Sequence, residues 1–128
     1  MRNYQPQKTS PYILPHNLYM QVLYLIRDYD RLKKEYHDII DETPFNDGQP
    51  RSGGITDTTA KKAVKIASIS DKLASIEQSL ILIPMEYRSH VFNNIVYGVI
   101  FPDYANRNTW SIYRCRFIHH VAKNMKWL

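Results

Sequence analysis

Two long stripes of apolar residues, separated by a segment rich in proline and glycine, restrict this chain to a helical fold. The first stripe lies between residues 16 and 41 and the second between residues 57 and 83. Within each, apolar positions are three and four residues apart, which places them on one face of an α-helix. The stripes are Leu18, Val22, Leu25, Tyr29, Leu32, Tyr36 and Ile39, then Ala63, Ile66, Ile69, Leu73, Ile76, Leu80 and Ile83. They predict an all-α protein built on a long antiparallel helical hairpin over residues 16–83.

The segments beside these helices have the composition of irregular structure. Residues 1–15 contain three prolines, which remove backbone donors and disfavour helical geometry, so a flexible arm is expected there. Residues 42–57 contain two prolines and three glycines and predict a flexible loop. Asp57 or Thr58 is the expected cap of the second helix. Tyr12, Tyr19 and Tyr24 lie off or before the first stripe and are expected to be scattered over the surface.

Residues 84–128 predict a shorter helical pair within the same single domain. Pro84 suits the first turn of a third helix, and Gly98 suits its end. A polar bend at residues 106–108 follows, and Thr109 is the expected cap of a last helix that reaches Leu128. A chain of 128 residues is sufficient for one domain with a modest core.

The positive charge of the chain is concentrated in this last helix. The formal net charge is +5, and residues 104–128 hold five basic side chains and no acidic one. At about 100° per residue, one side of the helix is apolar and the other is cationic. The apolar residues are Trp110, Tyr113, Phe117, Ile118, Val121, Met125 and Leu128, and the cationic side holds Arg116, His119, His120, Lys123 and Lys126. Arg114 falls in the apolar arc, where it is expected to extend to solvent or pair with Glu86 or Asp103.

The sequence contains no pattern typical of an enzyme, and no cofactor or metal is expected. Cys115 is the single cysteine, so no intramolecular disulfide is possible, and a buried thiol is the expected state. His119 and His120 are adjacent and point about 100° apart, which makes them a poor pair of metal ligands. No signal peptide or membrane-spanning apolar run is recognised, so a cytoplasmic location is expected.

Several short blocks resemble small phage and prophage proteins of Gram-positive bacteria, similar to the RinA/ArpU-type late-transcription regulators. The blocks are residues 83–88, Gly98, residues 109–118, Val121 with Ala122, and the upstream segment 52–60. The C-terminal half of those regulators looks like the helix-turn-helix of sigma-factor region four. The resemblance implies that the helix from Pro84 supports a recognition helix that begins at Thr109, in a bacterial host. Ten residues separate Gly98 from Thr109, which leaves room for one helical turn at residues 103–105, so the motif is truncated.

These features predict a DNA-binding transcriptional regulator whose partner is double-stranded DNA. Arg107, Arg116, Lys123 and Lys126 are expected to contact phosphates, Thr109, Ser111 and Arg114 to approach phosphates or base edges, and His120 to donate to phosphate when protonated. The alternative is a non-enzymatic helical interaction module, whose basic helix meets an acidic protein such as RNA polymerase or another phage protein. A homodimer through the long helices is also expected, because the stripe from Leu18 to Ile39 is longer than one short partner covers.

Overall fold

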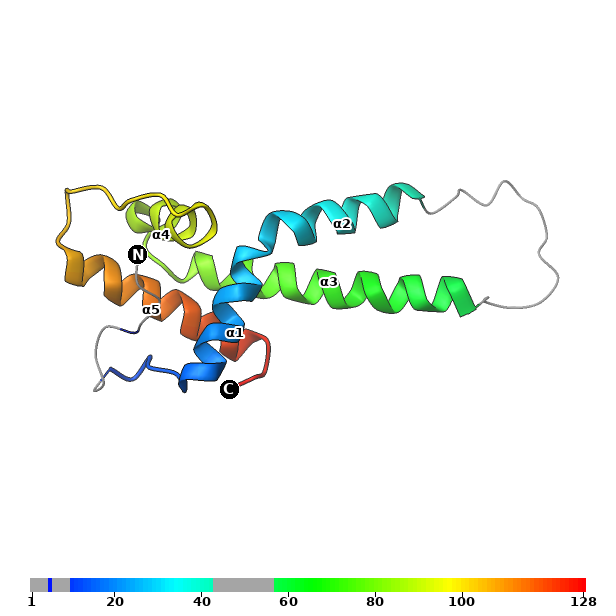
Figure 1. Ribbon diagram of the computed structural model, residues 1–128, viewed down its shortest axis with the longest axis horizontal. Helices are drawn as coiled ribbons and strands as arrows, with labels where there is room; N and C mark the ends of the chain where they lie inside the picture. The colour runs from blue at the N-terminus through cyan, green and yellow to red at the C-terminus, as the bar shows by residue number, and fades with distance from the viewer. Residues whose placement is uncertain (1–4, 6–9, 43–56) are drawn as a thin grey trace.

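The computed structural model describes residue 5, residues 10–42 and residues 57–128. Five α-helices and no strand occur in these ranges, which confirms the all-α prediction (Figure 1). The helices are α1 (His16–Arg27), α2 (Tyr29–Glu42), α3 (Asp57–Ile81), α4 (Met85–Tyr97) and α5 (Arg107–Asn124). Of the loop predicted at residues 42–57, Glu42 and Asp57 belong to α2 and α3, and residues 43–56 lie outside the described residues. Residues 1–4 and 6–9 of the predicted arm also lie outside them.

The predicted first long helix is divided at Asp28, so the prediction of one continuous helix is wrong there. Asp28 has φ −83° and ψ 4°, and its amide is shared between the carbonyls of Tyr24 and Leu25. From this point α2 continues in a different direction from α1 (Figure 1). The cause is packing: α1 contacts both α4 and α5, whereas α2 lies along α3. Leu23 and Ile26, which are outside the predicted stripe, are therefore completely buried.

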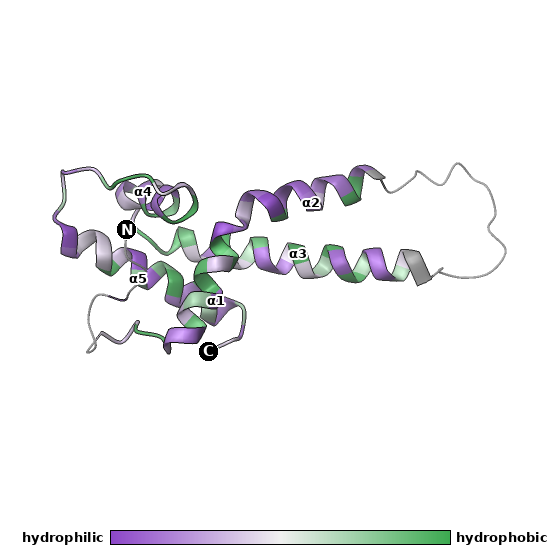
Figure 2. Cartoon of the chain, viewed as in Figure 1, coloured by the Kyte–Doolittle hydropathy of each residue, from purple (hydrophilic) through white to green (hydrophobic). Residues whose placement is uncertain are grey.

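Helices α2 and α3 run side by side in opposite directions and project from the rest of the molecule (Figure 1). We call this region, α2 with the first part of α3, the α2–α3 pair. Leu32, Ile39 and Ile69 are buried within it, while α2 is otherwise mostly hydrophilic (Figure 2). Lys65 forms an ion pair with Glu35 across the two helices at 2.8 Å. One apolar seam therefore holds this pair together.

Helices α1, α4 and α5 and the C-terminal part of α3 form a compact region that we call the head. Its largest completely buried side chains are Trp110, Tyr19, Phe117, Leu23, Ile26, Ile76, Ile83, Ile118, Val22, Val91 and Val121. Each such side chain contributes roughly 1.5–3 kcal/mol through removal of apolar surface from water. Tyr19, which was expected at the surface, is 1% exposed because α1 is covered from two sides.

The ends of the C-terminal helices differ in detail from the prediction. Gly98 ends α4 with φ 69°, a left-handed conformation that glycine adopts without strain. Pro84 is the residue before α4 rather than part of its first turn. Asn106, and not Thr109, caps α5, since its side-chain oxygen accepts the Thr109 amide at 2.9 Å. Helix α5 ends at Asn124, and Lys126 beyond it has φ 61°.

No helix in the described ranges combines the length and the hydropathy that a membrane span requires.

Candidate nucleic-acid interface

Aromatic contacts fix the segment that joins α4 to α5. Trp110 is 1% exposed, and its indole donates a hydrogen bond to the Pro102 carbonyl at 3.0 Å. The Phe101 ring stacks on it with 4.9 Å between ring centroids. The Tyr104 hydroxyl donates to the carbonyl of Glu86 on α4 at 2.5 Å. Residues 103–105, where one helical turn was predicted, form a turn and no helix. These contacts hold this turn and the start of α5 against α4.

The first turns of α5 present polar and cationic side chains to solvent. Arg107 and Asn108 are exposed, and Ser111 is half-buried beside them. Thr109 is also half-buried, and its hydroxyl donates to the capping side chain of Asn106 at 3.1 Å. Because the Thr109 hydroxyl is engaged in the cap, Arg107, Asn108 and Ser111 are the side chains best placed to meet a ligand. Asn108 is an addition to the residues predicted from the sequence.

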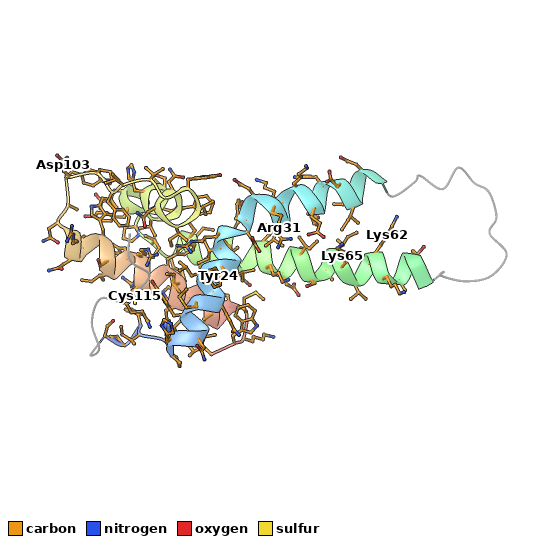
Figure 3. All side chains as sticks on the ribbon, in the orientation of Figure 1. Tyr24, Arg31, Lys62, Lys65, Asp103 and Cys115 are labelled. Atoms are coloured by element: carbon orange, nitrogen blue, oxygen red, sulfur yellow. The ribbon has the colours of Figure 1, made fainter. Side chains whose placement is uncertain are left out.

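Arg114 lies in the core of the head, away from the predicted DNA-contact surface. It is 5% exposed, and its guanidinium donates to the hydroxyl of Tyr19 on α1. The predicted partners Glu86 and Asp103 are not its partners: Glu86 lies on α4, and Asp103 is exposed in the connection before α5 (Figure 3). The burial arises because α1 packs on the side of α5 that carries position 114. Arg114 therefore joins α1 to α5 and does not reach solvent.

The middle of the predicted cationic side is covered by Tyr12, from the segment that was expected to be a free arm. The Cζ atom of Arg116 lies 5.4 Å from the centroid of the Tyr12 ring. The same ring is 5.3 Å from the ring of His119 and 5.9 Å from that of His120, both measured between centroids. All three α5 side chains are half-buried. The cationic side of α5, which was predicted to be open to solvent, is thus covered by Tyr12 in its centre.

Burial also changes the protonation of the two histidines. It is the main cause that lowers the pKa of His119; a hydrogen bond to the Tyr12 backbone opposes this effect in part, and the nearby Lys123 adds to it. Burial likewise lowers the pKa of His120, with further contributions from His119, Arg116 and Lys123. Since the ordinary pKa of histidine is about 6.5, both rings are neutral at pH 7. In this arrangement His120 does not supply the charge that phosphate binding would use.

Two predicted phosphate contacts remain exposed at the far end of α5. Lys123 lies in the last turn, and Lys126 lies just beyond the helix. Lys123 follows Arg107 by sixteen positions, which corresponds to about 24 Å along a helix axis. The exposed cations of α5 therefore form two groups, one at each end. Tyr12 is the residue whose role the sequence did not reveal, since a single aromatic between prolines gives no indication of its distant partner.

Cys115 has the environment of a structural thiol. It is buried, and its S–H donates to the carbonyl oxygen of Tyr12 at 3.5 Å. Burial raises its pKa, and the neighbouring Arg114 opposes that effect only in part. The expected buried state is confirmed. In the described part of the chain, no group of His, Cys, Asp and Glu side chains is arranged to hold a metal ion.

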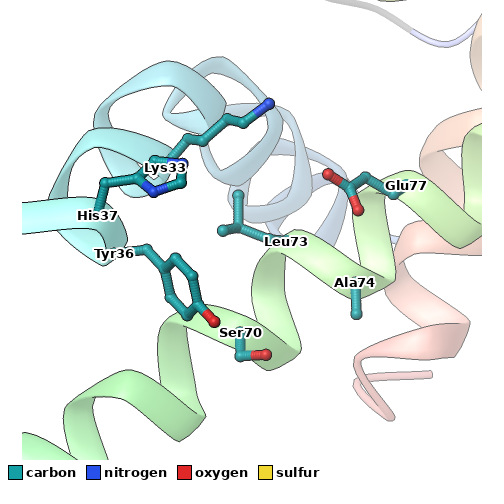
Figure 4. Close-up of a pocket in the computed structure, with 7 residues that line it drawn as sticks. All are labelled: Lys33, Tyr36, His37, Ser70, Leu73, Ala74 and Glu77. Carbon is teal, nitrogen blue, oxygen red and sulfur yellow. The ribbon is translucent and has the colours of Figure 1, made fainter. Parts of the chain in front are cut away.

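A depression of about 280 Å³ lies between α2 and α3 (Figure 4). Its lining residues are Lys33, Tyr36, His37, Ser70, Leu73, Ala74 and Glu77. Glu77 already accepts a hydrogen bond from the Tyr29 hydroxyl at 2.8 Å, and burial and this contact raise the pKa of Tyr29 to about 12. Leu73 and Ala74 are half-buried in the seam between the helices. The depression is thus a gap along that seam, beside the Glu77 carboxylate that already accepts a hydrogen bond from Tyr29.

Comparison of the chain with protein-family models, with curated proteins and with solved structures finds no match. The resemblance to phage regulators therefore remains a prediction from the sequence.

Proposed function

We propose that this protein is a non-enzymatic, phage-related transcriptional regulator that binds double-stranded DNA through the start of α5. The observation that supports this most is the exposed pair Arg107 and Asn108, on a helix start that Trp110 anchors through its hydrogen bond to Pro102 and its ring contacts with α4. Rigid placement matters because DNA contacts depend on holding several side chains in register at once. No acidic residue follows Asp103 in the chain, so this end of the molecule favours a polyanion.

The side chains at this start suit different parts of a duplex. Arg107 provides a guanidinium for a phosphate. Asn108 provides an amide, which can pair in bidentate fashion with adenine in the major groove, and Ser111 provides a hydroxyl for either a base edge or a phosphate. Lys123 and Lys126 form a second contact with the backbone at the far end of α5. If these three cations each neutralise a phosphate, the logarithm of affinity falls against the logarithm of salt with a slope of roughly −2 to −3.

Fluorescence anisotropy of a labelled duplex of mixed sequence, measured at several salt concentrations, tests the proposal. Arg107→Glu is expected to weaken binding by more than about tenfold, because it replaces an attraction to phosphate by a repulsion. Lys61→Glu changes the charge equally at an exposed position near the start of α3 and serves as the matched control. Absence of binding at low salt, or equal loss in both variants, contradicts the proposal.

A second candidate function, a helical interaction module, is favoured by exposed apolar side chains at the corner between α3 and α4. Ile81 is 65% exposed, Leu82 53% and Met85 80%, within five positions of the chain. Such a group suits a protein partner, such as RNA polymerase, another phage protein or a second copy of the chain.

Light scattering over a range of protein concentrations tests the self-associating form of this candidate. A dimer that Ile81→Ser with Met85→Ser converts to monomer supports it. A monomer at all concentrations leaves no role for a second copy, including a dimer through the long helices.

A further inference from the structure

Residues 10–14, which we call the strap, cross α5 before the chain enters α1. Tyr12 lies on Arg116, His119 and His120, with the distances given above. An aromatic face attracts a guanidinium electrostatically, so the Tyr12 ring makes a favourable cover for Arg116. The covered side chains come from the middle of α5, the helix with the largest net positive charge.

The strap is held by a few local contacts and by hydrogen bonds from Cys115 and His119 of α5 to the Tyr12 backbone. Leu14 is 3% exposed and anchors it in the core, and the Gln5 amide pairs with both backbone groups of Leu14 at 2.6 Å. Before Leu14, the Ile13 amide donates to the Ser10 carbonyl at 3.3 Å, and the Tyr12 amide donates to the Ser10 hydroxyl at 3.2 Å. Short segments held in this way open at lower free energy than the surrounding helices.

The cover also leaves the cations incompletely satisfied. The Nε atom of Arg116 is buried and has no hydrogen-bond partner within the described part of the chain. A ring face offers a guanidinium no hydrogen-bond acceptor, whereas a phosphate offers charged oxygens to several of its N–H groups at once. The nearby exposed Lys123 would extend the same contact. A DNA backbone would therefore compete with Tyr12 for Arg116.

We propose that the strap is an autoinhibitory cover: it masks the cationic Arg116 and the adjoining rings of His119 and His120, and its release lets Arg116 and Lys123 bind DNA phosphates together. This inference rests on the proposed function, because it assigns to the same helix a second contact surface that becomes available on opening. The exposed cations at the two ends of α5 then become one continuous row.

Tyr12→Ala tests the cover directly in the same anisotropy assay. Loss of one cation–π contact is expected to tighten duplex binding about two- to fivefold and to make the salt slope steeper by about one. Arg116→Gln added to Tyr12→Ala removes the gain, whereas Arg116→Gln alone has little effect because Arg116 is covered. Tyr12→Phe keeps the ring, and Tyr24→Ala removes a tyrosine that is 56% exposed on α1, so both are expected to bind as the unaltered protein does (Figure 3).

The outcomes separate this inference from the proposed function. If the unaltered protein binds duplex and Tyr12→Ala binds equally, the cover is overturned and the proposed function stands. If neither protein binds at low salt, both are overturned. Binding by Tyr12→Ala alone supports the cover.

Amide hydrogen exchange on the unaltered protein provides a second test that needs no variant to fold. The amides of Ile13 and Leu14 are hydrogen-bonded in the strap, so saturation with duplex is expected to speed their exchange. Unchanged or slower exchange of these two amides in the saturated complex overturns the cover.

Discussion

The helices of the head bury side chains on more than one side, whereas each helix of the α2–α3 pair buries a single stripe. In α1, the buried residues Val22, Leu23 and Ile26 cover a wide arc, because α4 and α5 both contact this helix. In α2, Leu32 and Ile39 are the buried hydrophobic residues, and α3 is the helix that α2 contacts most extensively. A two-helix seam excludes less water than a four-element core, so stability should be uneven along the chain. The pair is expected to open while the head stays folded.

Trp110→Ala is expected to have the largest effect, because it removes the largest buried side chain of the head. The substitution leaves a cavity and removes the hydrogen bond to Pro102, and it is expected to lower the free energy of unfolding by about 3–5 kcal/mol. Urea unfolding followed by circular dichroism measures this change. A loss below about 1 kcal/mol would mean that the start of α5 does not depend on this anchor.

Ile39→Ala tests the other side of the comparison. Ile39 is 8% exposed near the far end of the α2–α3 pair, where the seam can partly close after truncation. We expect a loss of about 2 kcal/mol, at the low end of the range for such changes, and faster amide exchange in the outer half of α2. Amides of α5 are expected to keep their protection. Equal acceleration in α5 would show that the pair and the head unfold as one unit.

Acid should destabilise the head through His119 and His120. Their pKa values are lower in the folded protein than in the unfolded chain, so their contribution to stability is complete above pH about 6.5. As the pH falls below that value, the unfolded chain takes up protons first and stability declines. Arg116 and Lys123 on α5 and Tyr12 in the strap are the charged or titratable neighbours that act on these rings.

Thermal unfolding between pH 7 and pH 5 measures this decline. His119→Gln with His120→Gln is expected to flatten it, and His37→Gln, at an exposed position of α2, is the control. An equal slope in both proteins would assign the acid sensitivity to other groups.

Lys65→Gln is expected to have the smallest effect. Lys65 pairs with Glu35 across the α2–α3 pair at 2.8 Å, but the lysine side chain is 56% exposed. The hydrogen bond from Lys65 is the main cause that lowers the pKa of Glu35. Exposed pairs of this kind stabilise proteins weakly and are screened by salt. A change in urea midpoint no larger than that of Lys61→Gln is therefore expected. A larger change would indicate that charge pairing, and not the apolar seam, holds the two helices together.

The sequence showed that the positive charges gather near the C-terminal end of the chain. It did not show which of these charged side chains are exposed to solvent. The acid-free stretch after Asp103 identified α5 as the helix of interest, and the exposed Arg107, Lys123 and Lys126 match that expectation. A helical wheel gives the angle of each side chain around the helix axis. It contains no information on which other segment of the protein packs against that side. Arg114 was correctly placed in the apolar arc, but its partner, Tyr19, lies 95 residues earlier in the chain.

The sequence by itself determined the helical class, most of α3 and the end of α4 at Gly98, although α3 ends at Ile81 and not at Ile83 as the apolar stripe predicted. These depend on local properties: the period of the apolar residues and the left-handed conformation that glycine permits. The tertiary structure decided the break at Asp28 and the cover of Arg116 by Tyr12. Both depend on which helix faces meet across long sequence separations. Contacts between distant segments select among many surfaces of similar local pattern, and only the folded chain makes that selection.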